Sequence, residues 1–259
     1  MIHVYYMKMN GDCPEGQSLA LFTTLYQMLP PERQEAVKRA KNEMIAKKRI
    51  YTGAFLQSIL SKETGLSMEQ LQYEYNEWGK PELAGEQRSV YFNLSHSGDY
   101  VVLAVSDGPI GIDIEHKSKN YLSLTKRCFC PEEYEDILSF ETEEERQRRF
   151  LEYWTMKEAY IKCVGEGMRI PLNSFLIRRE YEDISMAGSR GGEMSATEGH
   201  GNNLDNEPKN DNRSWFATLP LEEGYYMSVC ANNKEDIGNI LKNREDYVWN
   251  ILPSSLMGG

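Results

Sequence analysis

The sequence has few cysteines and histidines, no long apolar run and no excess of positive charge. Its five cysteines and four histidines are scattered, which argues against a disulfide framework or a structural zinc site. The apolar runs are strand-length, far below the roughly 20 residues that a membrane span needs, and the start of the chain lacks the pattern of a signal peptide. The net charge of −11 argues against nucleic-acid binding. A cytoplasmic protein with reduced thiols, acting on neither membranes nor nucleic acids, is predicted.

The charge is unevenly distributed along the chain. Residues 31–50 carry seven basic side chains against three acidic ones. The basic residues are Arg33, Lys38, Arg39, Lys41, Lys47, Lys48 and Arg49. A solvated helix face explains such a run, and an anion-binding surface is the functional alternative.

The patterns of apolar residues predict a mixture of helices and strands. Helices are expected from Pro31 to about Lys48 and over residues 50–61, 132–140 and 143–163. Strands are expected at the amino terminus and over residues 71–75, 90–94, 100–106, 110–115, 175–179, 214–219 and 225–231. Asp107-Gly108-Pro109 is expected to form a hairpin or another tight connection between two strands.

These elements predict an α+β fold with two similar halves in one chain. The halves are expected to span residues 1–108 and 109–232. Residues 186–212 are rich in Gly, Asn, Ser and acidic residues, and too poor in apolar ones to offset chain entropy, so a mobile insert is predicted there. Residues 233–259 are expected to form a tail with one weak helix.

Asp113 and Glu115 lie two apart in a predicted strand, so their carboxylates point to the same side while Ile112 and Ile114 face the other. Two neighbouring carboxylates repel unless a cation or a proton lies between them. Mg²⁺ prefers oxygen ligands of this kind. A strand with one solvated face is the simpler interpretation of this motif alone.

Glu158 and Lys162 lie four apart in a predicted helix and therefore share one face. An ordinary surface ion pair has this spacing and orientation. The functional interpretation assigns Glu158 to a metal and Lys162 to a phosphate.

A third motif, Asn93-Leu94-Ser95-His96-Ser97-Gly98, follows a short predicted strand. Hydroxyl, imidazole and backbone N–H groups in such a segment can bind an anion. A structural turn explains the composition almost as well.

Four motifs occur in a definite order along the chain. They are Trp78-Gly79-Lys80-Pro81, then Asn93 to Gly98, then Gly111-Ile112-Asp113-Ile114-Glu115, then Trp154-Thr155-Met156-Lys157-Glu158-Ala159-Tyr160-Ile161-Lys162 with Gly165-Glu166-Gly167. This order and spacing resembles the surfactin-synthetase-activating (Sfp-type) 4′-phosphopantetheinyl transferases, from the first strand to about Ala231.

The resemblance implies a pseudo-dimeric fold that binds coenzyme A between its halves. It implies Mg²⁺ at Asp113, Glu115 and Glu158, which together with Lys162 would contact the pyrophosphate. The residues that it places at the coenzyme are Arg33, Arg49, Lys80, Ser95, His96, Asp113, Lys157 and Lys162. Ala36 and Ile50 depart from the family pattern, where a lysine and a small polar residue stand.

The function implied is transfer of 4′-phosphopantetheine from coenzyme A to a serine of an apo acyl- or peptidyl-carrier protein, by a monomeric enzyme that releases 3′,5′-ADP. Glu158 and Lys162 are the predicted catalytic residues, with Glu158 or a metal-bound water as the base. Two alternatives stay open at this stage. One is another magnesium-dependent enzyme acting on a nucleotide-like pyrophosphate, and the other is a non-catalytic coenzyme A or carrier-binding module.

Overall fold

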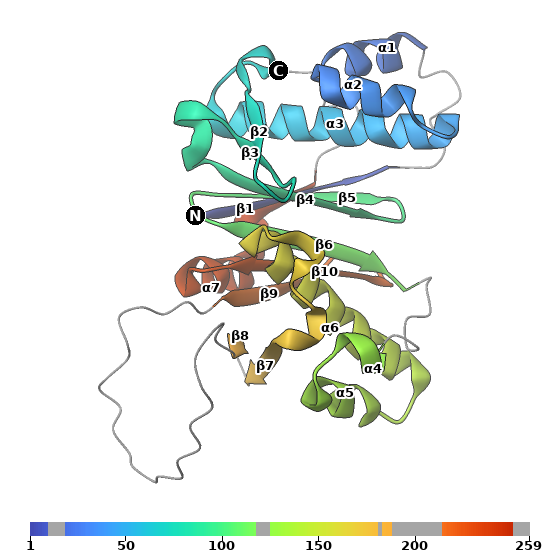
Figure 1. Ribbon diagram of the computed structural model, residues 1–259, viewed down its shortest axis with the longest axis vertical. Helices are drawn as coiled ribbons and strands as arrows, with labels where there is room; N and C mark the ends of the chain where they lie inside the picture. Colours follow the sequence, from blue (N-terminus) through green and yellow to red (C-terminus); the bar gives the residue numbers. More distant parts are fainter. Residues whose placement is uncertain (10–18, 118–124, 181–182, 188–213, 251–259) are drawn as a thin grey trace.

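Two β-sheets lie face to face in the middle of the molecule, and helices cover the outer side of each (Figure 1). The computed structural model describes residues 1–9, 19–117, 125–180, 183–187 and 214–250. The mixed α+β architecture predicted from the sequence is confirmed. Among the described helices, none has the length and apolar character needed to cross a membrane.

The first sheet has the strand order β11-β1-β5-β4, in which β11 (Val248–Asn250) comes from the end of the described chain. The elements of this half are β1 (Ile2–Lys8), α1 (Leu19–Gln27), α2 (Pro31–Lys38), α3 (Glu43–Thr64), the short hairpin β2 (Tyr73–Tyr75) and β3 (Pro81–Leu83), β4 (Tyr91–Ser97) and β5 (Tyr100–Ser106). Helix α3 buries Phe55, Leu56 and Ile59 against the outer face of this sheet.

The basic segment forms parts of two helices rather than one long helix up to Lys48. Helix α2 ends at Lys38, and α3 begins at Glu43. The reason is Asn42, whose side-chain oxygen accepts a hydrogen bond of 2.9 Å from the backbone N–H of Ile45 and so caps α3. The prediction of a continuous helix was wrong because the capping signal of Asn42 outweighed the helical pattern.

The chain passes from the first sheet to the second between Ser106 and Ile110. Strand β5 pairs with β1 and β4, whereas β6 (Ile110–His116) pairs with β10. The two strands therefore do not form a hairpin, and Asp107-Gly108-Pro109 is a short connection between the sheets.

The second sheet has the strand order β6-β10-β9-β8-β7. Its half contains α4 (Thr125–Cys128), α5 (Pro131–Leu138), α6 (Glu143–Val164), β7 (Leu176–Glu180), β8 (Asp183–Ala187), β9 (Trp215–Pro220) and β10 (Tyr225–Ala231). Helix α6 packs Phe150, Met156 and Ala159 on the outer face of this sheet. It begins at a capping box on Thr142 and ends at Gly165, which has a φ of 81°.

The predicted insert overlaps a strand at its start. Met186 and Ala187 belong to β8, where they pair with Ile177 and Leu176 of β7. These two residues are therefore part of the sheet. The rest of the predicted insert, residues 188–212, lies outside the described residues.

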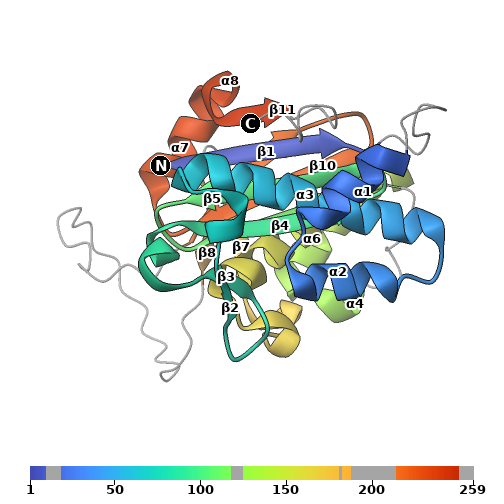
Figure 2. The same ribbon diagram turned by 90° about the horizontal axis from the view of Figure 1, so that it is seen from above.

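Residues 234–250 form more structure than one weak helix. Helix α7 (Lys234–Lys242) buries Ile237 and Ile240 between the two sheets. After α8 (Arg244–Tyr247), strand β11 (Val248–Asn250) lies alongside β1 and pairs with it in parallel (Figure 2). The Trp249 ring stacks on that of Tyr5 at 5.1 Å. The chain after the second half thus returns to complete the first sheet.

Candidate active site

Side chains of β4 connect the two halves by hydrogen bonds to β6. Asn93, Ser95 and Ser97 lie two apart in β4, so all three face the second half. The bonds are from the backbone N–H of Ile112 to Asn93 Oδ1 at 2.9 Å, from Ser95 Oγ to Asp113 Oδ1 at 2.8 Å, and from Ser97 Oγ to Glu115 Oε2 at 2.9 Å. The motif from Asn93 to Ser97 is therefore a strand, not the turn or loop predicted to follow one, and Gly98 is the first residue of the next turn.

Strand β6 separates its polar and apolar side chains as predicted. Ile112 and Ile114 are fully buried in the core between the two sheets. Asp113 lies on the other side, where α6 packs, and is itself 5% exposed. The alternation of the strand thus holds a carboxylate in a nearly dry position.

Lys162 of α6 forms the main contact of Asp113. Its ammonium donates to Asp113 Oδ1 at 2.6 Å, to Ser95 Oγ at 3.0 Å and to the Ile112 carbonyl at 3.2 Å. Burial raises the pKa of Asp113, although the charge of Lys162 and the hydrogen bonds from Lys162 and Ser95 act to lower it. Lys162 is therefore not one half of an ordinary surface pair within its own helix, because it reaches across to β6.

Glu158 lies one turn earlier on α6, half-buried. Burial raises its pKa, and repulsion from the carboxylates of Asp113 and Glu115 raises it further, against the opposing charge of Lys162. The close packing of β6 on α6 depends on Gly111, since a Cβ there would lie 1.9 Å from the carbonyl oxygen of α6 residue 159. Glu158 is thus repelled electrostatically by both of the other predicted carboxylates.

Oxygen-ligand chemistry suits this group of side chains. Among the residues that the structure describes, none donates a hydrogen bond to the buried Asp113 Oδ2, which is unusual for a carboxylate oxygen. In the part of the chain that the structure describes, no three Asp, Glu, His or Cys side chains already form a metal-ligand cluster. The donor types and the unsatisfied Asp113 oxygen fit a hard divalent cation such as Mg²⁺.

A pocket of about 760 Å³ lies between α2, α3 and β4 and extends to β6. Its lining includes four basic or imidazole side chains and one carboxylate. These are Arg33 of α2, Lys48 and Arg49 of α3, His96 of β4 and Glu115 of β6. The structure thus brings together three predicted coenzyme residues, Arg33, Arg49 and His96. They share the pocket with Glu115, one of the three predicted metal-binding carboxylates.

The alternation of β4 explains why neighbouring motif residues serve different parts of the site. Ser95 points to Asp113, whereas His96 points into the pocket. Burial lowers the pKa of His96, and the charges of Lys162 and Lys48 lower it further. An anion bound in this pocket would offset that repulsion and favour the protonated imidazole.

Sequence reasoning missed several residues of the site. Lys48 lines the pocket and donates to the Gly98 carbonyl at 3.0 Å. Ser97 contacts Glu115. The period-two spacing of Asn93, Ser95 and Ser97 was a signal that could have identified the row of side chains facing β6.

Lys157 does not belong to the site, and its assignment to coenzyme binding was wrong. Its side chain is 0% exposed and its ammonium pairs with Glu133 at 2.9 Å. It also donates to the carbonyls of Leu172 at 2.8 Å and Phe175 at 2.5 Å. All of these partners lie in the core of the second half, away from Lys162.

Lys80 lies at the junction of the halves, but its ammonium is engaged by the protein. It donates to the carbonyls of Lys162 at 2.7 Å and Cys163 at 3.3 Å, at the carboxyl end of α6. Burial lowers its pKa. The ammonium of Lys80 therefore stabilises the helix end, as a cation does at that terminus, and does not line the cationic pocket around His96.

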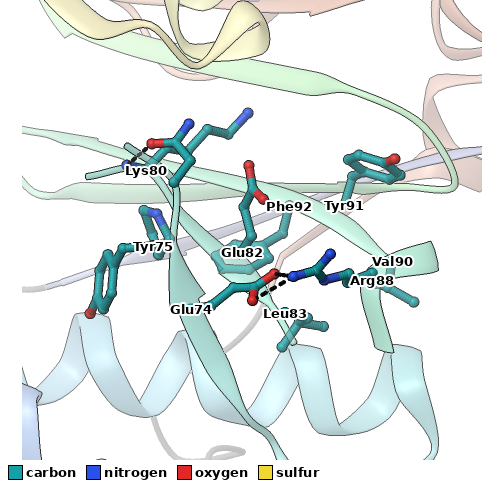
Figure 3. A pocket seen from close by; sticks show the side chains of 11 residues that line it. Glu74, Tyr75, Lys80, Glu82, Leu83, Arg88, Val90, Tyr91 and Phe92 are labelled. Carbon is teal, nitrogen blue, oxygen red and sulfur yellow. Dashed lines mark hydrogen bonds and ion pairs between the residues drawn. The ribbon is translucent and has the colours of Figure 1, made fainter. Parts of the chain in front are cut away.

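A second, smaller pocket of about 380 Å³ lies beside Lys80 under the β2–β3 hairpin (Figure 3). The ion pair between Arg88 and Glu74, 2.6 Å long, forms part of its wall, and Glu82 points into it. Apart from Lys80, this pocket contains none of the predicted site residues.

A cationic pocket that extends to Glu115, two residues along β6 from the Asp113–Lys162 pair, suits a ligand that carries several phosphates. Comparison with known proteins gives the class. A model of the 4′-phosphopantetheinyl transferase superfamily matches residues 109–230, and a model of the amino-terminal part of 4′-phosphopantetheinyl transferase matches residues 17–108. The two matches meet between the sheets and fit a fold of two halves.

Individual relatives agree with the family models. The 4′-phosphopantetheinyl transferase Sfp of Bacillus subtilis is 30% identical over 203 residues, which cover 78% of this chain and 82% of that protein. Another 4′-phosphopantetheinyl transferase of Bacillus subtilis is 33% identical over 77% of this chain and 80% of that protein. The transferase psf-1 of Bacillus pumilus is 38% identical over 57% of this chain and 62% of that protein. The chain belongs to the 4′-phosphopantetheinyl transferase superfamily and is an enzyme of that family, which confirms the resemblance seen in its motifs.

Proposed function

We propose that this enzyme transfers the 4′-phosphopantetheine arm of coenzyme A to a serine of an apo acyl- or peptidyl-carrier protein. The family uses coenzyme A and acts on carrier proteins. The observation that carries the proposal for this chain is the position of Glu115. This residue lines the cationic pocket and also acts electrostatically on Glu158, one helical turn from Lys162. A phosphate bound in the pocket and a pyrophosphate at the carboxylates can then belong to one ligand.

The 3′-phosphate of coenzyme A would bind in the cationic pocket. Arg33, Lys48 and Arg49 supply positive charge there, and His96 supplies a ring N–H. Arginine can contact a phosphate with two parallel hydrogen bonds, so Arg33 suits this role. Ser95 does not line this pocket but contacts Asp113 and Lys162, so it would lie beside the pyrophosphate rather than the 3′-phosphate.

The pyrophosphate would lie toward Asp113, Glu115, Glu158 and Lys162. Mg²⁺ held by the three carboxylates would neutralise charge on the pyrophosphate oxygens. The buried, unpartnered oxygen of Asp113 supports its role as a ligand. Lys162, already 2.6 Å from Asp113, supplies a second positive charge at the same place.

The reaction then follows from charge and alignment. The serine oxygen forms a bond to the β-phosphorus, the bond from that phosphorus to the bridging oxygen breaks, and 3′,5′-ADP leaves with the electron pair. Lys162 stabilises the charge on the leaving group. Glu158, directly or through a water, accepts the serine proton.

The enzyme is proposed to act as a monomer in the cytoplasm. Side chains from both halves of one chain meet at β4 and β6, so the site needs no second copy. The basic side chains of α2 and α3 around the pocket offer an acidic carrier a local positive surface on an otherwise acidic protein.

Mass spectrometry of a carrier protein tests the proposal. The enzyme is incubated with coenzyme A, Mg²⁺ and a panel of apo acyl- and peptidyl-carrier proteins. We expect at least one carrier to gain one phosphopantetheine, with an equal amount of 3′,5′-ADP released. Release of 3′,5′-ADP without any carrier would instead indicate a hydrolase acting on the pyrophosphate, and no change in any carrier would contradict the proposal.

A further inference from the structure

The turn between β4 and β5 forms part of the wall of the cationic pocket. Ser97 and Gly98 line the pocket, and the Gly98 carbonyl accepts the hydrogen bond from Lys48. The position of this turn therefore sets the positions of a pocket cation and of the backbone around His96. Although the turn belongs to the first half, the second half contacts it at both ends.

Tyr225, the first residue of β10, contacts the turn from the second half. Its hydroxyl oxygen accepts a hydrogen bond of 3.1 Å from the backbone N–H of Asp99. It also lies against Gly98, which has a φ of +55° and where a Cβ would come within 2.4 Å of the Tyr225 hydroxyl. Only glycine combines this left-handed backbone with the space that the tyrosine needs.

The Tyr225 ring is itself held firmly. It packs edge-on against the Tyr100 ring at 4.7 Å and lies tilted against the His116 ring at 4.4 Å. Glu222, in the turn between β9 and β10 just before Tyr225, accepts hydrogen bonds from Tyr100 and from Lys8, the latter at 2.7 Å. The packing of its ring therefore fixes the position of the Tyr225 hydroxyl against the β4–β5 turn.

The other end of the turn is fixed by β6. Ser97 Oγ donates to Glu115 and accepts from the backbone N–H of His116 at 3.2 Å. The turn is thus held at Ser97 by one strand of the second half and at Asp99 by another. The pocket built from α2, α3 and β4 is complete only with the second half in place.

We infer that Tyr225 is a positioning residue for the phosphate end of coenzyme A. It acts through Asp99 and Gly98 and does not itself touch the ligand. This inference rests on the proposed function, because it assigns the 3′-phosphate to the pocket that the turn lines. It predicts that the Tyr225 hydroxyl affects coenzyme binding far more than the chemical step.

Tyr225→Phe removes the hydroxyl and keeps the ring. We expect KM for coenzyme A to rise about three- to tenfold, the loss expected for one hydrogen bond to a backbone N–H, with kcat and the melting temperature nearly unchanged. The KM for 3′-dephospho-coenzyme A should change much less. Tyr6→Phe is the matched control, since the Tyr6 ring lies 6.3 Å from that of Tyr100 in the same aromatic group but outside the turn.

Gly98→Ala supplies an independent measurement. We expect it to raise KM for coenzyme A, and to do so less when Tyr225 is already phenylalanine, because the new methyl group then no longer meets a hydroxyl. The inference would be contradicted if the fold-changes in KM of the two single variants simply multiplied in the double variant, or if KM were unchanged in Tyr225→Phe. Neither result would contradict the proposed transferase function. A wild-type enzyme that modifies no carrier would contradict the proposed function instead.

Discussion

Two lysines of helix α6, Lys157 and Lys162, both form ion pairs with carboxylates, but in opposite settings. Lys157 and Glu133 are each 0% exposed. The carboxylate oxygens of Glu133 also accept hydrogen bonds from the backbone N–H groups of Cys130 and Ile177. Lys162 is 27% exposed, and one buried oxygen of its partner Asp113 accepts no hydrogen bond from the described part of the chain.

This difference supports our proposal that the Lys157 pair is structural and the Lys162 pair functional. Around Lys157 the protein supplies the partners itself, so nothing is left for a ligand to contact. Around Lys162 the protein leaves a carboxylate oxygen unsatisfied and another carboxylate, Glu158, with a raised pKa. Such incomplete satisfaction is energetically unfavourable and is found where a ligand completes the group.

The largest effect is expected at Asp113. Asp113→Asn keeps the shape but removes the charge, and a neutral amide is a poor ligand for Mg²⁺. We expect carrier modification to fall by at least about 10²–10³-fold, as for loss of one electrostatic group from a transition state. The free energy of unfolding should change by less than about 1 kcal/mol, because lost attraction to Lys162 is offset by less repulsion from Glu158.

Initial rates over a Mg²⁺ titration, with urea unfolding in parallel, test this prediction. Asp107→Asn is the control, because that carboxylate pairs with the chain's amino terminus at an exposed position. Wild-type turnover and metal dependence in Asp113→Asn would remove the assignment of the metal site.

Lys157→Met should have the next largest effect, on stability rather than on activity. It leaves the Glu133 carboxylate buried without its cation, which destabilises a protein by about 3–5 kcal/mol. Urea unfolding of the variant measures this loss, and the folded fraction should keep most of its turnover. If the stability were unchanged but turnover were lost, Lys157 would belong to the catalytic group.

The double variant Lys157→Met/Glu133→Leu distinguishes the contribution of the ion pair to stability from that of the volume its side chains fill. Replacing both members of a buried pair by apolar side chains is often neutral or stabilising. We therefore expect the double variant to recover part of the stability lost in Lys157→Met. A further loss would show that the backbone N–H groups of Cys130 and Ile177 depend on the Glu133 oxygens.

Helix geometry explains which of these residues the sequence could distinguish. Glu158 and Lys162 lie four residues apart, about 40° from each other around the helix axis. In the structure both lie on the side of α6 that faces Asp113. Lys157 and Lys162 lie five apart, about 140° from each other, so they cannot share a face. The error on Lys157 arose from carrying over a motif as a block, and the spacing alone could have corrected it.

Other features needed contacts between distant parts of the chain. The position of β11 follows from pairing with β1, almost the whole chain length away, and its three residues carry no periodic pattern. The hydrogen bond from Asp99 to Tyr225 likewise joins residues 126 apart. Local patterns predicted the polar face of β6, but not which strand lies against it.

The third effect concerns His96, an exposed residue whose side chain lines the cationic pocket. His96→Ala should raise KM for coenzyme A by roughly ten- to a hundredfold, the loss of one hydrogen bond between charged groups. The KM for 3′-dephospho-coenzyme A should rise much less. Steady-state kinetics with both substrates test this, and equal rises would remove the 3′-phosphate from this pocket.

The smallest effect is expected for an ion pair that is neither buried nor part of the site. Glu43 and Lys47 lie 2.7 Å apart on the first turns of α3, with 80% and 40% of their side chains exposed. The hydrogen bond and charge of Lys47 lower the pKa of Glu43, so any stabilisation is present above the ordinary carboxyl pKa and disappears as the pH falls through the lowered one. Water and salt screen such a pair, so Glu43→Gln should leave the urea midpoint at neutral pH unchanged within error, in low and high salt alike. A loss comparable to that of Lys157→Met would show that exposure does not rank these ion pairs, and the contrast between the two lysines of α6 would then need another cause.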